Sequence, residues 1–130
     1  MGTLLDTSIL IDIERSRGTI PTTDDTAIAA ITASELQQGV LRADRAHRTT
    51  RESFVEGILA TIPTIPFSLR VARVHARIWT ELAAAHVTVD AADLEVAATT
   101  IALGWELATL DRKHFARISG LRLVPERPVR

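Results

Sequence analysis

Apolar positions along this chain follow two patterns, and each pattern predicts a different kind of element. Four short apolar runs are typical of buried strands, whereas longer segments repeat apolar residues every three or four positions, as amphipathic helices do. The expected strands are 4–5, 26–31, 106–110 and 121–124. The expected helices are 9–14, 32–41, 54–62, 69–86, 93–103 and a short turn at 112–117. Because strands alternate with helices, the sequence predicts an α/β fold of three layers, α/β/α, around a central, mostly parallel sheet.

Several residues lie where helices are expected to begin or end. Thr7 or Ser8 is expected to cap the first helix through its hydroxyl group. Thr32 and Glu35 have the spacing of a capping box and predict the start of the second helix. Gly104 follows an alanine-rich helix and is its expected C-terminal residue, because glycine adopts the left-handed conformation at low cost.

The connections are polar or rich in proline. Residues 15–25 are expected to form a loop, and 42–51 predicts either a turn or a continuing exposed helix. The segment 64–67 is interpreted as a short extended link, too rich in proline for a central strand, and Ser68 is expected to cap the helix that follows. Residues 125–130 form a polar tail. No repeat or linker interrupts the pattern, so residues 1–130 are expected to form a single domain.

Composition narrows the class of protein. The chain has 130 residues, of which 46% are hydrophobic and 24% charged, as in an ordinary globular domain. It has no cysteine, which excludes disulfides and thiolate metal sites. Asp6 and Asp12 interrupt the first apolar run, so a signal peptide is not expected, and no apolar stretch is long enough to cross a membrane. We therefore expect a cytoplasmic protein without membrane association. The net charge of −1 argues against a strongly basic nucleic-acid binder.

Four acidic residues occupy the same kind of position in the predicted fold. Asp6 follows the first strand, Glu35 and Asp93 open helices, and Asp111 follows a later strand. In a parallel sheet the carboxyl ends of strands and the amino ends of helices share one edge, which is where open α/β sheets place their active sites. Each residue also has a plain structural interpretation as a helix cap, a partner of a helix dipole or a turn residue. Four such positions at one edge favour a shared chemical role.

A cluster of carboxylates needs a cation. Neighbouring carboxylates repel one another and raise one another's pKa unless a positive charge neutralises them. Ligands that are all oxygen favour Mg²⁺ or Mn²⁺ over zinc, and Mg²⁺ is typical of chemistry on phosphates. The histidines show no metal-ligand spacing and are interpreted as surface or helix-flank residues: His47, His75, His86 and His114.

Four sequence blocks, in order, resemble those of the PIN-domain family and, more narrowly, its VapC-type toxins from bacterial toxin–antitoxin pairs. Each block is short, but the ordered set extends from about Gly2 to Val124. The blocks are Leu4–Ser8, Thr32–Leu36 with Gly39, Asp93–Thr99 with Gly104, and Thr109–Asp111 with Phe115.

This resemblance implies a metal-dependent endoribonuclease toxin. It assigns metal binding and catalysis with Mg²⁺ or Mn²⁺ to Asp6, Glu35, Asp93 and Asp111, and it gives supporting contacts to the hydroxyl of Thr7 or Ser8. Asp111 is at the family position that varies most. The resemblance also implies an RNA substrate, a homodimer and a small VapB-type antitoxin that covers the acidic cleft.

One departure from the family pattern is Glu95, where many relatives carry a hydrophobic or neutral residue. We interpret Glu95 as a surface residue, and an additional carboxylate near the metal is the alternative.

Two other functions use the same residues differently. An aspartate-nucleophile phosphatase would attack through Asp6, but the haloacid-dehalogenase type has a second carboxylate two residues later, where this chain has Ser8. A binding module would keep the fold without activity, although all four acidic residues are present. A gene for a small DNA-binding protein immediately upstream would favour the toxin over both alternatives.

Arginines form two rows whose role is left open by the sequence. They either hold RNA phosphates beside the acidic site or lie on a solvated face, paired with Glu52, Glu56 or Glu81. The first row is Arg42, Arg45, Arg48 and Arg51, and the second is Arg70, Arg73 and Arg77.

Overall fold

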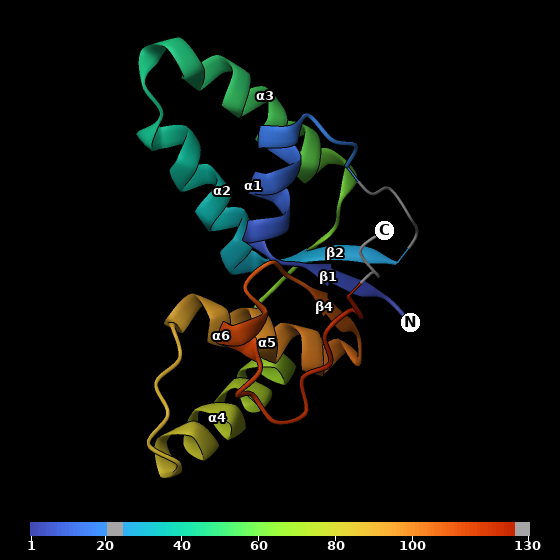
Figure 1. The fold of residues 1–130 in the computed structure, drawn as a ribbon, viewed down its shortest axis with the longest axis vertical. Coiled ribbons are helices and arrows are strands. Elements are labelled where there is room, and N and C mark those ends of the chain that lie inside the picture. The colour runs from blue at the N-terminus through green and yellow to red at the C-terminus, as the bar shows by residue number, and fades with distance from the viewer. Residues whose placement is uncertain (21–24, 127–130) are drawn as a thin grey trace.

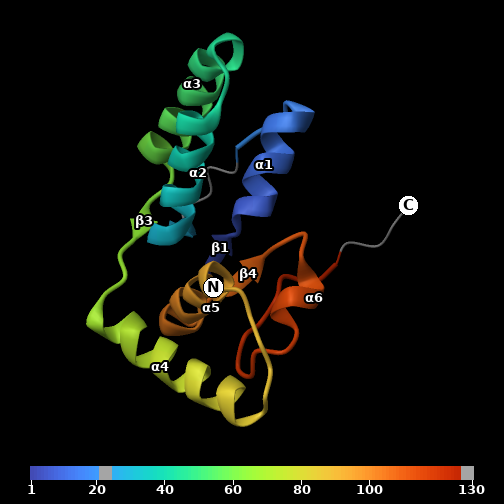
Figure 2. The ribbon, with the colours of Figure 1, turned by 90° about the vertical axis from the view of Figure 1, so that its left-hand side faces the viewer.

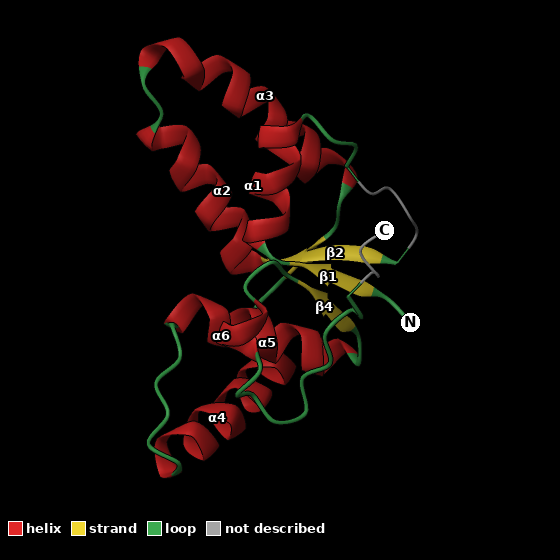
Figure 3. Cartoon of the chain, viewed as in Figure 1, coloured by secondary structure: helices red, strands yellow, loops and turns green. Residues whose placement is uncertain are grey.

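The computed structural model describes residues 1–20 and 25–126, and within them a parallel sheet separates two layers of helices (Figures 1 and 3). The strands are β1 (Thr3–Leu5), β2 (Thr26–Ala29), β3 (Thr64–Ile65) and β4 (Glu106–Ala108). The helices are α1 (Thr7–Ser16), α2 (Ala30–Arg42), α3 (Arg45–Thr61), α4 (Leu69–Ala84), α5 (Ala91–Leu103) and α6 (Arg112–Phe115). The strand order is β3-β2-β1-β4, and every pairing is parallel. The predicted α/β/α architecture is confirmed.

Successive side chains of the strands point to opposite faces of the sheet and pack into a hydrophobic core on each face. Leu4 and Leu107 pack into the cluster under α4 and α5, whereas Leu5 and Ile28 pack into the cluster under α1, α2 and α3. Figure 2 shows the two groups of helices on either side of the strands. Burial on both faces explains why these strands are short continuous apolar runs rather than alternating ones.

The ends of several helices follow the sequence signals. Ser68 accepts a hydrogen bond from the backbone N–H of Val71 at 3.3 Å and caps α4 as expected. Gly104 adopts a left-handed conformation (φ 70°) and ends α5, also as expected. The polar stretch 42–51 contains a break after α2 and then the start of α3, where Asp44 caps the helix through the N–H of His47.

The predicted capping box at Thr32 is wrong. β2 ends at Ala29 and α2 begins directly at Ala30, so Thr32 lies inside the first turn of the helix. The Thr32 side chain is fully buried, and its hydroxyl has no partner among the described residues. Glu35 consequently has no capping role and is available for a contact with α1.

The expected cap of the first helix by Thr7 or Ser8 is also wrong. α1 begins at Thr7 and has Asp6 in its N-cap position, so both hydroxyl residues lie in the first turn. The helix continues to Ser16, two residues into the predicted loop, and Arg17 then closes it in a left-handed conformation. Residues 21–24 of that loop lie outside the described residues.

The two edges of the sheet differ from prediction. The link at 64–67 contributes a two-residue strand, β3, which pairs with β2 at the edge, where proline neighbours are tolerated. The expected last strand at 121–124 is reduced to a single bridge between Leu107 and Leu123. Residues 127–130 of the polar tail are not described. No helix in the described part of the chain is long and apolar enough to cross a membrane.

Candidate active site

Asp6 leaves β1 at the carboxyl edge of the sheet and is almost fully buried. Its backbone N–H donates to the carbonyl of Ala108 at 2.9 Å, which fixes the end of β1 beside the end of β4. Its Oδ2 accepts hydrogen bonds from the hydroxyl groups of Ser8 and Thr109, both at 2.8 Å. Two donors on one oxygen orient this carboxylate and leave Oδ1 without a hydrogen bond among the described residues.

Thr109 connects Asp6 to the loop that carries Asp111. Its hydroxyl is buried, donates to Asp6, and accepts a hydrogen bond from the backbone N–H of Asp111 at 2.9 Å. Ser8 adds a second connection, because its hydroxyl accepts from the N–H of Leu110 at 3.0 Å. The first turn of α1 and the loop after β4 are therefore joined both through the Asp6 carboxylate and directly through Ser8.

Asp93 lies in the first turn of α5, and its charge interacts with those of other acidic residues at the same edge. The pKa of Asp93 is raised from an ordinary 3.8 to about 6. Burial is the largest cause, followed by the negative charges of Asp6 and Asp90, with a smaller contribution from Asp111, and His114 partly offsets the rise. Asp6 and Asp111 therefore lie within electrostatic range of Asp93, and a shared role of the three in metal binding stays a prediction.

Glu35 lies on the α1 side of this edge and contacts a different group. Its Oε1 accepts a hydrogen bond from the hydroxyl of Thr7 at 2.7 Å, which links α2 to α1. It also lines a small pocket of about 120 Å³ between α1, α2 and α3, together with Glu14 and Arg51. The charges that shift the pKa of Asp93 are those of Asp6, Asp90, His114 and Asp111.

The carboxylates of Asp6, Glu35 and Asp93 are suited to a hard divalent cation, although they do not converge on a single point. Among residues 1–20 and 25–126, no three acidic or histidine side chains are grouped closely enough to hold a metal ion. Oδ1 of Asp6 and Oε2 of Glu35 accept no hydrogen bonds among the described residues, and Asp93 is a partly exposed carboxylate. These oxygens match the ligand preference of Mg²⁺ and Mn²⁺. Binding such an ion requires the side chains to turn toward it, which their mutual repulsion opposes while no cation is bound.

A family model and several known proteins match this chain. The family model of the PIN domain matches residues 3–121. The chain belongs to the PIN-domain family. It is 30% identical over 128 residues to a protein of Rickettsia felis named Ribonuclease VapC1, covering 95% of this chain and 96% of that one. It is 34% identical over 130 residues to Ribonuclease VapC of Rickettsia bellii, with the same two coverages. Among solved structures, it matches a chain of Rickettsia felis VapBC2 bound to a promoter DNA fragment. That match has a TM-score of 0.83 and 25% identity, and it covers 95% of this chain and 98% of the other.

Two residues of this PIN domain's site were not identified from the sequence. Thr109 was assigned to a strand, and no local pattern reveals that its hydroxyl reaches Asp6, 103 positions away. His114 is exposed, as expected of a surface residue, but its Nδ1 lies 3.8 Å from Oδ2 of Asp93. That contact depends on how α6 packs against α5, and the spacing of histidines along the sequence does not predict it.

Several members of the arginine rows have partners within the fold of this PIN domain. Arg77 pairs with Glu81 at 3.1 Å, as predicted for a solvated face. Arg51 pairs with Glu14 at 3.4 Å, rather than with the expected Glu52 or Glu56. Arg48 donates to the backbone carbonyls at the end of α2, which lack partners within the helix. Arg51 lines the same pocket as Glu35, and an RNA role for the two rows stays a prediction.

The raised pKa of Asp93 predicts a pH dependence for this PIN domain without metal. A carboxyl group whose pKa is higher in the folded state binds its proton more tightly there, so unfolding releases a proton between pH 3.8 and about 6. The free energy of unfolding should therefore fall as pH rises through this window. Thermal melts in EDTA measure this, and Asp93→Asn should flatten the decline. An equal decline in the variant would assign the effect to other groups.

Proposed function

We propose that this PIN domain is an endoribonuclease toxin that cleaves RNA phosphodiester bonds with the help of Mg²⁺ or Mn²⁺ and is neutralised by a VapB-type antitoxin. The observation that carries the proposal is the position of Asp6, Asp93 and Asp111 at one sheet edge, close enough for the other two charges to raise the pKa of Asp93. The two relatives named Ribonuclease VapC support the same reaction class, because each similarity extends over 95% of the chain.

The chain's own carboxylates would hold one or two divalent cations, and the scissile phosphate would bind to those cations. Asp6, Asp93 and Glu35 supply carboxylate oxygens, and Asp111 assists from the loop after β4. When bound, a divalent ion supplies an activated water for in-line attack on phosphorus and stabilises the leaving 3′ oxygen. Ser8 and Thr109 fix the orientation of Asp6 through Oδ2, so that its other oxygen has little rotational freedom. Thr7 does the same for Glu35.

The proposed partners follow from the relatives. The matched chain of Rickettsia felis belongs to a VapBC2 structure that is bound to a DNA fragment from its promoter. We expect this chain to bind a small antitoxin over the acidic edge, to form a homodimer, and to act on RNA in the cytoplasm.

Growth after induction tests this function. Expression of the chain should arrest growth and create new RNA 5′ ends within minutes. If a gene for a small DNA-binding protein lies immediately upstream, co-expression of its product should relieve both effects. Growth arrest without new 5′ ends would contradict the ribonuclease function and would favour an inactive interaction module.

A further inference from the structure

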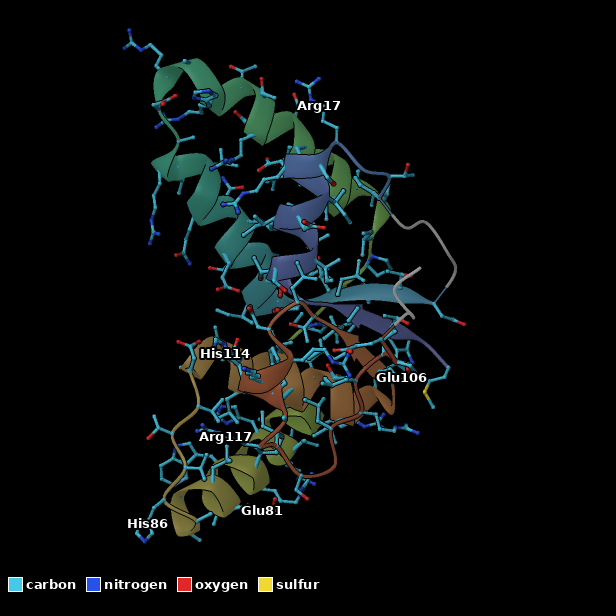
Figure 4. All side chains as sticks on the ribbon, in the orientation of Figure 1. Arg17, Glu81, His86, Glu106, His114 and Arg117 are labelled. Atoms are coloured by element: carbon cyan, nitrogen blue, oxygen red, sulfur yellow. The ribbon has the colours of Figure 1, made fainter. Side chains whose placement is uncertain are left out.

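A pocket of about 290 Å³ adjoins Asp93 and has walls of opposite charge. One wall comes from the segment that enters α5 and contains Asp90 and Asp93. The other wall, called the cationic wall here, carries the cations Lys113 and Arg117 together with His114, from α6 and the turn after it. Figure 4 shows His114 and Arg117 on the same side of the molecule, beside the start of α5. The 3.8 Å approach of His114 to Asp93 shows that the two walls meet.

The cationic wall is held in place by the hydrophobic core. Phe115 and Ile118 are 1% and 4% exposed, and both belong to the cluster under α4 and α5. Lys113 and Arg117 alternate with these anchors and are exposed. Because the backbone between these anchors is already ordered, an anion that binds Lys113 and Arg117 need order only their side chains.

Lys113 and Arg117 also differ from the neighbouring basic residue. Arg112 donates to the carbonyl of Val124 at 2.7 Å and pairs with Glu126 at 3.1 Å, so its charge is already used within the fold. Within the described ranges, Lys113 and Arg117 make no ion pair or side-chain hydrogen bond, although Asp90 and Asp93 share their pocket. Two unpaired cations on one side of a pocket are available for a ligand of opposite charge.

We propose that Lys113 and Arg117 form a binding site for an RNA phosphate next to the scissile one. This inference rests on the proposed ribonuclease function and adds to it the residues that position the substrate. The carboxylates of the site repel the negatively charged RNA backbone. Cations bound at the site would offset this repulsion only for the phosphate that they contact. The phosphate beside it needs its own positive partner, and the cationic wall is the surface that adjoins Asp93.

The two side chains suit complementary tasks on a phosphate. Lys113 is a compact charge with a flexible stem, whereas the planar guanidinium of Arg117 can donate two parallel hydrogen bonds to phosphate oxygens. Neither contact involves a base, so the site contributes to affinity and to the position of the RNA without selecting a base sequence.

Steady-state cleavage of a single-stranded RNA at 50 and 200 mM salt tests the proposal. The variant Lys113→Gln/Arg117→Gln removes both charges from exposed positions, and circular dichroism checks its fold. Its KM should rise about tenfold at low salt, while kcat stays within about twofold, because the contacts bind the substrate before and during the reaction alike. Each lost phosphate contact should also reduce the slope of log affinity against log salt by roughly 0.7.

Arg17→Gln is the matched control. Arg17 is exposed at the end of α1, on the far side of the sheet from His114 and Arg117 in Figure 4, and it should leave KM and the salt slope unchanged. If the wild type cleaves RNA and the double variant has the wild-type KM and salt slope, the phosphate site is wrong and the ribonuclease function stands. The same conclusion holds if that double variant has lost antitoxin binding. A wild type that cleaves no RNA would overturn the ribonuclease function, and the phosphate site with it.

Discussion

Asp93→Asn is expected to reduce RNA cleavage by roughly a thousandfold or more, a loss of about 4 kcal/mol of transition-state stabilisation. Asparagine has the same shape but lacks the charge that a divalent cation and its phosphate ligand require. The fold should survive, because Asp90 rather than Asp93 caps α5, through the N–H groups of Ala92 and Asp93 at 2.9 and 3.3 Å. The metal-free variant should even melt at a higher temperature at pH 7, since one carboxylate that Asp6 repels is gone.

Glu95→Gln is the control for this experiment. Glu95 is two residues further along α5, is only partly buried, and makes no side-chain hydrogen bond or ion pair among the described residues. Cleavage close to the wild-type rate is expected for this variant. Equal rates for Asp93→Asn and Glu95→Gln would remove Asp93 from the site.

Glu35→Gln is the second change with a large expected effect. The amide oxygen of glutamine can still accept the hydrogen bond from Thr7, so the link between α1 and α2 should persist. Since Glu35 does not cap α2, the free energy of unfolding should change by no more than about 1 kcal/mol. Cleavage should nevertheless fall by about two orders of magnitude or more, because the negative charge is what a metal site needs.

Thr7→Val separates this electrostatic role from the structural one. It removes the hydroxyl donor to Glu35 but retains the carboxylate, so it should cost less activity than Glu35→Gln. The measurements are chemical denaturation and initial cleavage rates of both variants. If Glu35→Gln unfolds the protein but keeps the wild-type rate in its folded fraction, Glu35 serves the α1–α2 contact and not the reaction.

The sequence predicted those parts of the fold that depend on local physics. Leu4 and Leu5 are a buried run that ends at a charged residue, so the position of Asp6 at the strand end followed directly. Ser68 and Gly104 have strong local preferences at helix ends, and the structure confirms both. Parallel topology placed the ends of β1 and β4 at one edge, which also brought Asp6 and Asp111 to the same region.

The errors arose where tertiary contacts determine the structure. The spacing of Thr32 and Glu35 matches a capping box, but β2 continues straight into α2, and burial of Thr32 outweighs the preference of its hydroxyl for a cap. The hydrogen bond from Thr109 to Asp6 spans two elements that meet only in the folded sheet. The cationic wall was missed because Lys113 and Arg117 gain meaning only from their position beside Asp93.

The most direct test of the central claim is RNA cleavage by purified protein at controlled metal content. Protein stripped with EDTA should be inactive, and adding Mg²⁺ or Mn²⁺ should restore cleavage and raise the melting temperature of the wild type more than that of Asp6→Asn. Asp6→Asn should remain folded and inactive at every metal concentration. Undiminished cleavage in EDTA, with metal analysis showing none bound, would contradict the account.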